Sequence, residues 1–167
     1  MLGRLIDNLA RVAATGACCI LVAMVVLILY EILLRSAFAS STYVLDEFIG
    51  YGVATMTFLS FAAALKDNVF IRVNLVLANV GSVPRRVIEV LSCALGTILF
   101  SVIAFYFGKL FLRDFLRGTV SNSVAEVPLW IPEFTLLLGI VILVLQFLLL
   151  TLRYARGAPI LDAQEEL

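Results

Sequence analysis

Four long apolar stretches alternate with shorter polar segments along this chain of 167 residues. A helix needs about 20 apolar residues to cross the roughly 30 Å hydrocarbon core of a bilayer, and each stretch is close to that length. The pattern predicts an all-α membrane protein, with a single four-helix transmembrane domain over residues 1–155 and a short tail at 156–167. The predicted transmembrane helices cover residues 12–34, 48–65, 87–109 and 132–152.

The segment between the second and third stretches, "KDNVFIRVNLVLANVGSVPRR", is too polar to cross a bilayer and too apolar for an ordinary loop. Read as a helix, it has Asn68, Arg72 and Asn79 on one face and apolar side chains largely on the other. This pattern is typical of a short amphipathic helix in the headgroup layer, with Arg72 against lipid phosphate. Two alternatives stay open: the apolar face packs on a partner protein, or the segment is an irregular hairpin.

Composition supports the membrane class. The chain is 63% hydrophobic and 14% charged, with a mean hydropathy of +1.11, whereas a soluble domain carries far more charge. The three cysteines lie in apolar stretches and are expected to be free thiols. The sequence has no histidine and no metal-ligand or nucleophile motif, so we predict that the chain is not an enzyme and binds no cofactor or metal. A net charge of zero gives no reason to expect a nucleic-acid partner.

Basic residues predict the orientation. If both termini are cytoplasmic, eight basic residues lie on the cytoplasmic side and four on the outer side, as the positive-inside rule favours. The eight are Arg4, Arg11, Lys66, Arg72, Arg85, Arg86, Arg153 and Arg156, and the four are Arg35, Lys109, Arg113 and Arg117.

Charged residues stand near the ends of the predicted spans, and none lies at mid-depth, where a transporter needs ionisable groups. Glu31 and Arg35 are one helical turn apart and are expected to pair. Gln146 is the one strongly polar side chain deep in a stretch, and it is expected to hydrogen-bond another helix, within the chain or across an interface.

Small residues follow one side of the second span and include Gly50, Ala54 and Thr57. Helices approach each other closely in lipid at such positions, because packing rather than hydrophobicity drives their association there. Ser92 and Gly96 form a similar pair in the third span. We therefore expect the second span to be the internal packing helix and the fourth to be more exposed to lipid.

Several segments together resemble the small membrane subunit of tripartite ATP-independent periplasmic (TRAP) transporters. Arg35 precedes the second span and Glu47 begins it, as in that family, and "FIRVNLV" at 70–76 resembles the family's H-I-R-V-D-L segment. Phe70 and Asn74 replace the usual His and Asp, which indicates a divergent branch. "VPLWIPEF" at 127–134, which includes Trp130, resembles the family's entrance to the last span.

This resemblance implies a bacterial inner-membrane subunit without catalysis. It would bind the large membrane subunit, which carries the substrate and sodium sites, and extend the stationary scaffold of that subunit in the lipid. A periplasmic binding protein would deliver the substrate, commonly an organic acid. The residues that we expect at a subunit or lipid interface are Arg35, Glu47, Gly50, Ala54, Thr57, Arg72 and Trp130, and those expected to contact the binding protein are Arg113 and Arg117.

Glu47 is expected to cap the second span or to pair with a basic group such as Arg35. Two other classes remain possible from the sequence: the small subunit of a tripartite tricarboxylate transporter, and an autonomous four-helix exporter. The exporter is the weaker alternative, because it needs a carboxylate near the middle of the first span and Glu31 lies close to the end.

Overall fold

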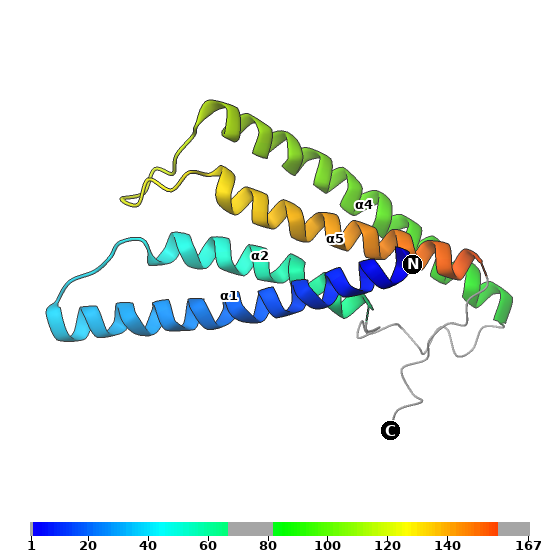
Figure 1. The fold of residues 1–167 in the computed structure, drawn as a ribbon, viewed down its shortest axis with the longest axis horizontal. Coiled ribbons are helices and arrows are strands. Elements are labelled where there is room, and N and C mark those ends of the chain that lie inside the picture. Colours follow the sequence, from blue (N-terminus) through cyan, green and yellow to red (C-terminus); the bar gives the residue numbers. More distant parts are fainter. Residues whose placement is uncertain (1, 67–81, 157–167) are drawn as a thin grey trace, which may run out of the picture.

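The computed structural model describes residues 2–66 and 82–156, which form four helices and no β-strand. These are α1 (Leu2–Phe38), α2 (Leu45–Lys66), α4 (Ser82–Arg117) and α5 (Trp130–Ala155), arranged up and down (Figure 1). Each is long and apolar enough to cross a membrane, so the predicted fold class is confirmed and the chain is a multi-pass membrane protein. The interfacial helix predicted between the second and third spans, with Arg72, lies outside the described residues.

The helices are longer than the apolar stretches that predict them. α1 has 37 residues and α4 has 36, which gives each a length of about 55 Å at 1.5 Å per residue. Both continue through polar segments, in which Arg, Lys and Glu are good helix formers. α4 begins at Ser82, so Pro84 lies in its first turn, where a missing N–H removes no intrahelical bond.

The helices pack in a row, with α2 and α5 in the middle. α4 packs on α5, α5 on α2, and α2 on α1, while α1 also contacts α5 (Figure 1). α5 has the largest buried share of the four apolar stretches, so the prediction that the fourth span is the more lipid-exposed helix is wrong. The reason is that lipid tails and Leu or Ile side chains are equally apolar, so hydrophobicity does not indicate which helix is enclosed.

Close contacts between α2, α4 and α5 form the middle of the core. A Cβ at Gly139 of α5 would lie 3.1 Å from the Cβ of Phe58 and 3.3 Å from the backbone N of Leu59, so glycine permits α2 and α5 to approach. Phe100 of α4 stacks on Phe147 of α5 at 5.5 Å between ring centroids. Gly96 faces the same Phe147 ring, as its predicted packing role requires.

Polar contacts hold together the end of the bundle where α1 begins and α5 ends, which we name the inner end. Gln146 donates from Nε2 to the carbonyl oxygen of Ile6 at 3.1 Å, which confirms the predicted interhelical hydrogen bond. Arg153 pairs with Asp7 at 3.0 Å. Arg86 of α4 donates from Nε to the carbonyl oxygen of Tyr154 at 2.9 Å. These inner-end ties connect α1, α4 and α5.

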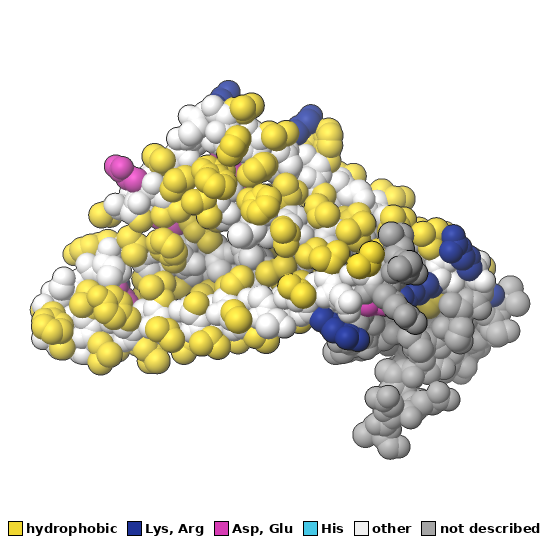
Figure 2. All heavy atoms as spheres, viewed as in Figure 1, with side chains coloured by type: hydrophobic (Ala, Val, Ile, Leu, Met, Phe, Trp, Pro, Cys, Tyr) yellow, Lys and Arg dark blue, Asp and Glu magenta, His cyan; other side chains and the backbone are white. Residues whose placement is uncertain are grey.

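Figure 2 shows the types of side chain on one face of the molecule. Hydrophobic side chains cover α1 along its length. Basic side chains gather at the inner end, and others lie along the upper edge of the view, on α4. The opposite end, where α1 ends and α5 begins, is the outer end.

Candidate functional site

Glu31 lies near the outer end of α1 and is 2% exposed. Its carboxylate accepts hydrogen bonds from the hydroxyl of Ser41 and from both the backbone N–H and the hydroxyl of Thr42, at 3.2 Å and 2.6 Å. Arg35 completes the set by donating from Nε at 2.8 Å, so the predicted Glu31–Arg35 pair is confirmed. One buried carboxylate therefore fastens the α1–α2 loop to α1, and we name these contacts the Glu31 clamp.

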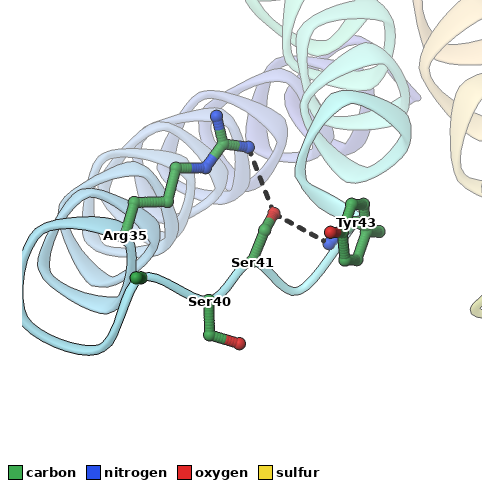
Figure 3. A pocket seen from close by; sticks show the side chains of 5 residues that line it. Arg35, Ser40, Ser41 and Tyr43 are labelled. Atoms are coloured by element: carbon green, nitrogen blue, oxygen red, sulfur yellow. Dashed lines mark hydrogen bonds between the residues drawn. The ribbon is translucent and has the colours of Figure 1, made fainter.

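The loop beside this clamp borders a shallow cavity of about 400 Å³ that is wide open to solvent. Its lining residues are Arg35, Ala39, Ser40, Ser41 and Tyr43 (Figure 3). Ser41 lies at the centre, because its Oγ accepts from Arg35 Nη2 at 3.3 Å and from the Tyr43 backbone N–H at 3.2 Å. Arg35 is thus shared between Glu31 and Ser41 and does not pair with Glu47.

Glu47, in the first turn of α2, faces the α4–α5 loop instead. Its Oε1 accepts from the Tyr51 hydroxyl at 2.7 Å, and the side chains of Ser121 and Ser123 lie beside the carboxylate. A carboxylate in a first turn also complements the helix dipole. Glu47 therefore connects α2 to the α4–α5 loop, which the sequence did not indicate because the serines follow it by more than 70 positions.

Arg113, near the end of α4, is held in place by its neighbour Asp114. The guanidinium donates from Nε and Nη2 to the two carboxylate oxygens at 3.0 and 3.1 Å, and Asp114 is 3% exposed. The hydroxyl of Thr119 also donates to Asp114, at 3.2 Å. Arg117 lies one turn further along α4, and its side chain is exposed.

The α4–α5 loop is a compact hairpin between Arg117 and Trp130. Ser121 N–H donates to Val127 O at 2.9 Å and Leu129 N–H donates to Thr119 O at 3.1 Å. Trp130 begins α5 and sets its ring edge against Phe115 at 5.7 Å between centroids. Trp130 thus connects α5 to the end of α4.

The small residues predicted at an interface lie along α2. A Cβ at Gly50 would have no atom within 4 Å, so this glycine leaves open space rather than a close contact within the chain. Ala54 is half-buried, and the hydroxyl of Thr57 is satisfied by the Val53 carbonyl at 2.7 Å. Gly52, by contrast, packs against Met24 of α1, so it is the α2 glycine that serves the α1–α2 contact.

The polar side chains described above connect helices and loops of a membrane component with four apolar helices. Across residues 2–66 and 82–156, no group of three or more His, Cys, Asp or Glu side chains could hold a metal ion.

The comparisons with known proteins agree with that class. The family described as tripartite ATP-independent periplasmic transporters, DctQ component, matches residues 24–157. The chain therefore belongs to this family, as the small component of a TRAP transporter, and the family is one of transporter components rather than enzymes. The searches of curated proteins and of solved structures found no match.

Proposed function

We propose that this chain is a non-catalytic small subunit that binds the large membrane subunit and extends its stationary scaffold. In this proposal the large subunit carries the sodium and substrate sites, and a periplasmic binding protein delivers an organic acid to it. The chain lies in the bacterial inner membrane with both termini in the cytoplasm. The family match supports this proposal over a tripartite tricarboxylate subunit or an autonomous exporter.

The main support for this proposal is that the buried polar residues bind partners within the chain. A transporter that holds its own cargo needs polar groups and broken helices around a site at mid-depth. Here the Gln146 amide donates to the carbonyl oxygen of Ile6, and the hydroxyls of Thr55 and Thr135 are hydrogen-bonded at 3.2 Å. The carboxylates of Glu31 and Asp114 accept hydrogen bonds from loop residues near the outer end. Glu89, the remaining buried polar residue, also has an interaction partner. These groups stabilise the bundle, as a static support requires.

The open side of α2 is the surface that we assign to the large subunit. Gly50 and the neighbouring exposed Val53 leave room for another helix, and Ala54 and Thr57 continue this small-residue side. Arg35 and Glu47 would mark its outer edge, Trp130 would anchor α5 at the headgroups, and Arg72 would bind lipid phosphate or a carboxylate of the large subunit. The proposed contact of Arg113 and Arg117 with the binding protein is taken up below.

Reconstitution tests the proposed function. Vesicles containing the large subunit, this chain, or both are supplied with the binding protein and a sodium gradient, and substrate uptake is measured. We expect uptake only when both membrane proteins are present, and we expect them to copurify. Uptake by vesicles that contain this chain alone would contradict the proposal.

Arg72 provides a separate test of anchoring. Arg72→Glu reverses the charge toward a phosphate or carboxylate partner and should lower copurification with the large subunit and uptake by at least tenfold. Arg72→Lys keeps the positive charge and serves as the control, with both measurements close to wild type. Unchanged assembly and uptake in Arg72→Glu would remove the anchoring role.

A further inference from the structure

We propose that the outer end of α1, together with the loop that follows it, is the site where the soluble binding protein docks, and that it receives a carboxylate side chain of that partner. We name residues 32–44 the α1 tip. This inference rests on the proposed function, because the binding protein and the periplasmic position of the outer end both come from it.

The α1 tip projects past its neighbour α2. The loop returns to α1 at Glu31, where Thr42 is bound, although α1 continues for seven more residues to Phe38. Seven residues of helix have a length of about 10 Å. Figure 1 shows this projection, since α1 extends well beyond the start of α2.

The tip is too far out to be covered entirely by lipid tails. The apolar stretch of α1, Leu5–Phe38, has 34 residues and is about 51 Å long. A bilayer measures about 30 Å across its hydrocarbon core and about 45 Å with its headgroups, and the mean helix tilt of about 20° shortens the stretch only to about 48 Å. The stretch thus exceeds the hydrocarbon core by about 18 Å but the bilayer with its headgroups by only about 3 Å, which is less than one helical turn. The span of α2, Leu45–Leu65, is about 32 Å long and matches the hydrocarbon core, so a tip that projects about 10 Å past the start of α2 lies at the depth of the headgroups and reaches their outer surface.

Large apolar side chains are nevertheless exposed there. Phe38 is 75% exposed and Tyr43 is 77% exposed, and Leu33 is exposed one turn earlier. Aromatic side chains just outside the hydrocarbon occur in headgroup belts as well as in protein interfaces. The nearby Arg35 favours an interface, because Tyr and Arg are enriched among the residues that dominate binding energy. The tip has such a composition around its cavity.

Arg35 gives the cavity its charge. It is the only charged residue among residues 32–44, and its side chain is 59% exposed. A guanidinium has five N–H donors, of which Arg35 uses one toward Glu31 and one toward Ser41, so three remain. Ser40 also lines the cavity, with its hydroxyl directed away from Arg35 and Ser41 (Figure 3). A carboxylate is the side-chain group that matches these donors, because Arg binds it in a planar, charge-assisted geometry.

The tip is also held in one shape before any partner arrives. Ala39 and Tyr43 have left-handed backbones, with φ of 49° and 57°, a conformation that is unfavourable for a residue with a Cβ. The Glu31 clamp maintains this conformation through Ser41 and Thr42. A surface ordered in advance loses less conformational entropy on binding, which favours docking.

The α4–α5 hairpin offers a direct comparison. The sequence prediction places the contact at Arg113 and Arg117. Arg113 donates from two of its five N–H groups to Asp114, so it keeps as many unshared donors as Arg35, and the donor count does not separate the two sites. The α1 tip differs from the hairpin in the cavity beside Arg35 and in the exposed Phe38 and Tyr43. These features favour the α1 tip over the hairpin.

The test measures the Kd of the purified binding protein for the full membrane complex in lipid nanodiscs. Ser40→Glu adds a negative charge at the rim of the cavity, which repels a carboxylate that approaches Arg35, and Tyr43→Asn removes the aromatic ring while Asn still tolerates the left-handed backbone. We expect each to weaken docking at least tenfold and to leave copurification with the large subunit unchanged. The matched control is Val124→Asn on the α4–α5 hairpin, since Val124 is 78% exposed at the same end, and its Kd should equal that of wild type.

Three outcomes would overturn the docking proposal. The first is an unchanged Kd in both tip variants. The second is weakening by Val124→Asn or Arg117→Ala without weakening by the tip variants, which places the contact on the hairpin. The third is loss of copurification in the tip variants, which makes the tip a contact of the large subunit. A wild-type chain that fails to copurify with the large subunit contradicts the proposed function itself, which separates the two failures.

Discussion

Glu31 has an unusual position for an ionisable residue in a membrane protein, because it is buried and yet fully supplied with donors. A buried carboxylate is costly unless it is hydrogen-bonded and paired, and here Arg35, Ser41 and Thr42 meet both conditions. Glu31 lies next to a loop that contains two residues with left-handed backbones, which explains why a carboxylate is buried at this position. The charge-assisted bonds compensate for the backbone strain at Ala39 and Tyr43.

Replacing this carboxylate tests the clamp. In Glu31→Gln, the amide NH2 would face the donors of Thr42 or Arg35, so the free energy of unfolding should fall by about 1–3 kcal/mol. Thermal unfolding in nanodiscs measures the loss, and hydrogen exchange should rise in residues 39–44. The control is Asp46→Asn, which alters an exposed carboxylate at the start of α2 and should change hydrogen exchange in residues 39–44 little. Equal exchange in the two variants would show that Glu31 does not hold the loop.

Residue spacing predicted part of this site. The i to i+4 spacing of Glu31 and Arg35 was sufficient to predict their pair, because helical geometry fixes that distance. Ser41 and Thr42 were not predicted, since their contact with Glu31 depends on the path of the loop after Phe38. The neighbours of Glu47 were missed for a similar reason, as Ser121 and Ser123 approach it only in the folded bundle.

At the scale of helices, α5 carries most of the packing. α5 contacts each of the other three described helices, and its buried residues include Ile140, Leu143, Gln146 and Leu150. Gly139 permits the contact with α2. The glycine positions therefore distinguish contacts within the chain from surfaces left open for another protein.

Two glycine substitutions separate these roles. Gly139→Leu places a side chain against Phe58 and the backbone of Leu59, so it should destabilise the bundle by about 1–3 kcal/mol, measured by thermal unfolding of the isolated chain. Gly50→Leu enters open space and should leave that midpoint unchanged while reducing copurification with the large subunit. Normal assembly of the Gly50→Leu chain would contradict our assignment of the large subunit to this side of α2.

The sequence predicted the four membrane-spanning helices that the described residues form, and these helices continue beyond the predicted spans. Each apolar run is visible because lipid excludes polar side chains from the hydrocarbon, but no such rule ends a helix at the headgroups. α4 accordingly continues past Lys109 to Arg117, where Gly118 adopts a φ of 60° as the chain leaves the helix. The central position of α5 was not predictable from hydropathy, because Gly139 and the aromatic contacts decide it.

For the whole molecule, orientation is the property on which the functional proposals depend. Asn122→Cys on the outer hairpin and Arg156→Cys at the inner end are introduced separately into a chain whose three cysteines are replaced by alanine. The excess of basic residues at the inner end predicts that a membrane-impermeant maleimide labels position 122 in cells with a permeable outer membrane. Position 156 should react only after the inner membrane is opened. The reverse result would place the α1 tip in the cytoplasm and exclude docking of a periplasmic protein there.

α1 is fixed to its neighbours at both ends. Asp7 and Ile6 bind Arg153 and Gln146 of α5, Glu31 binds the loop that leads into α2, and Gly52 of α2 packs against Met24 between them. A helix about 55 Å long that is held in this way behaves as a strut. We expect its two extremities to move together, so that a shift imposed on one face of the bilayer arrives at the opposite face with the same size.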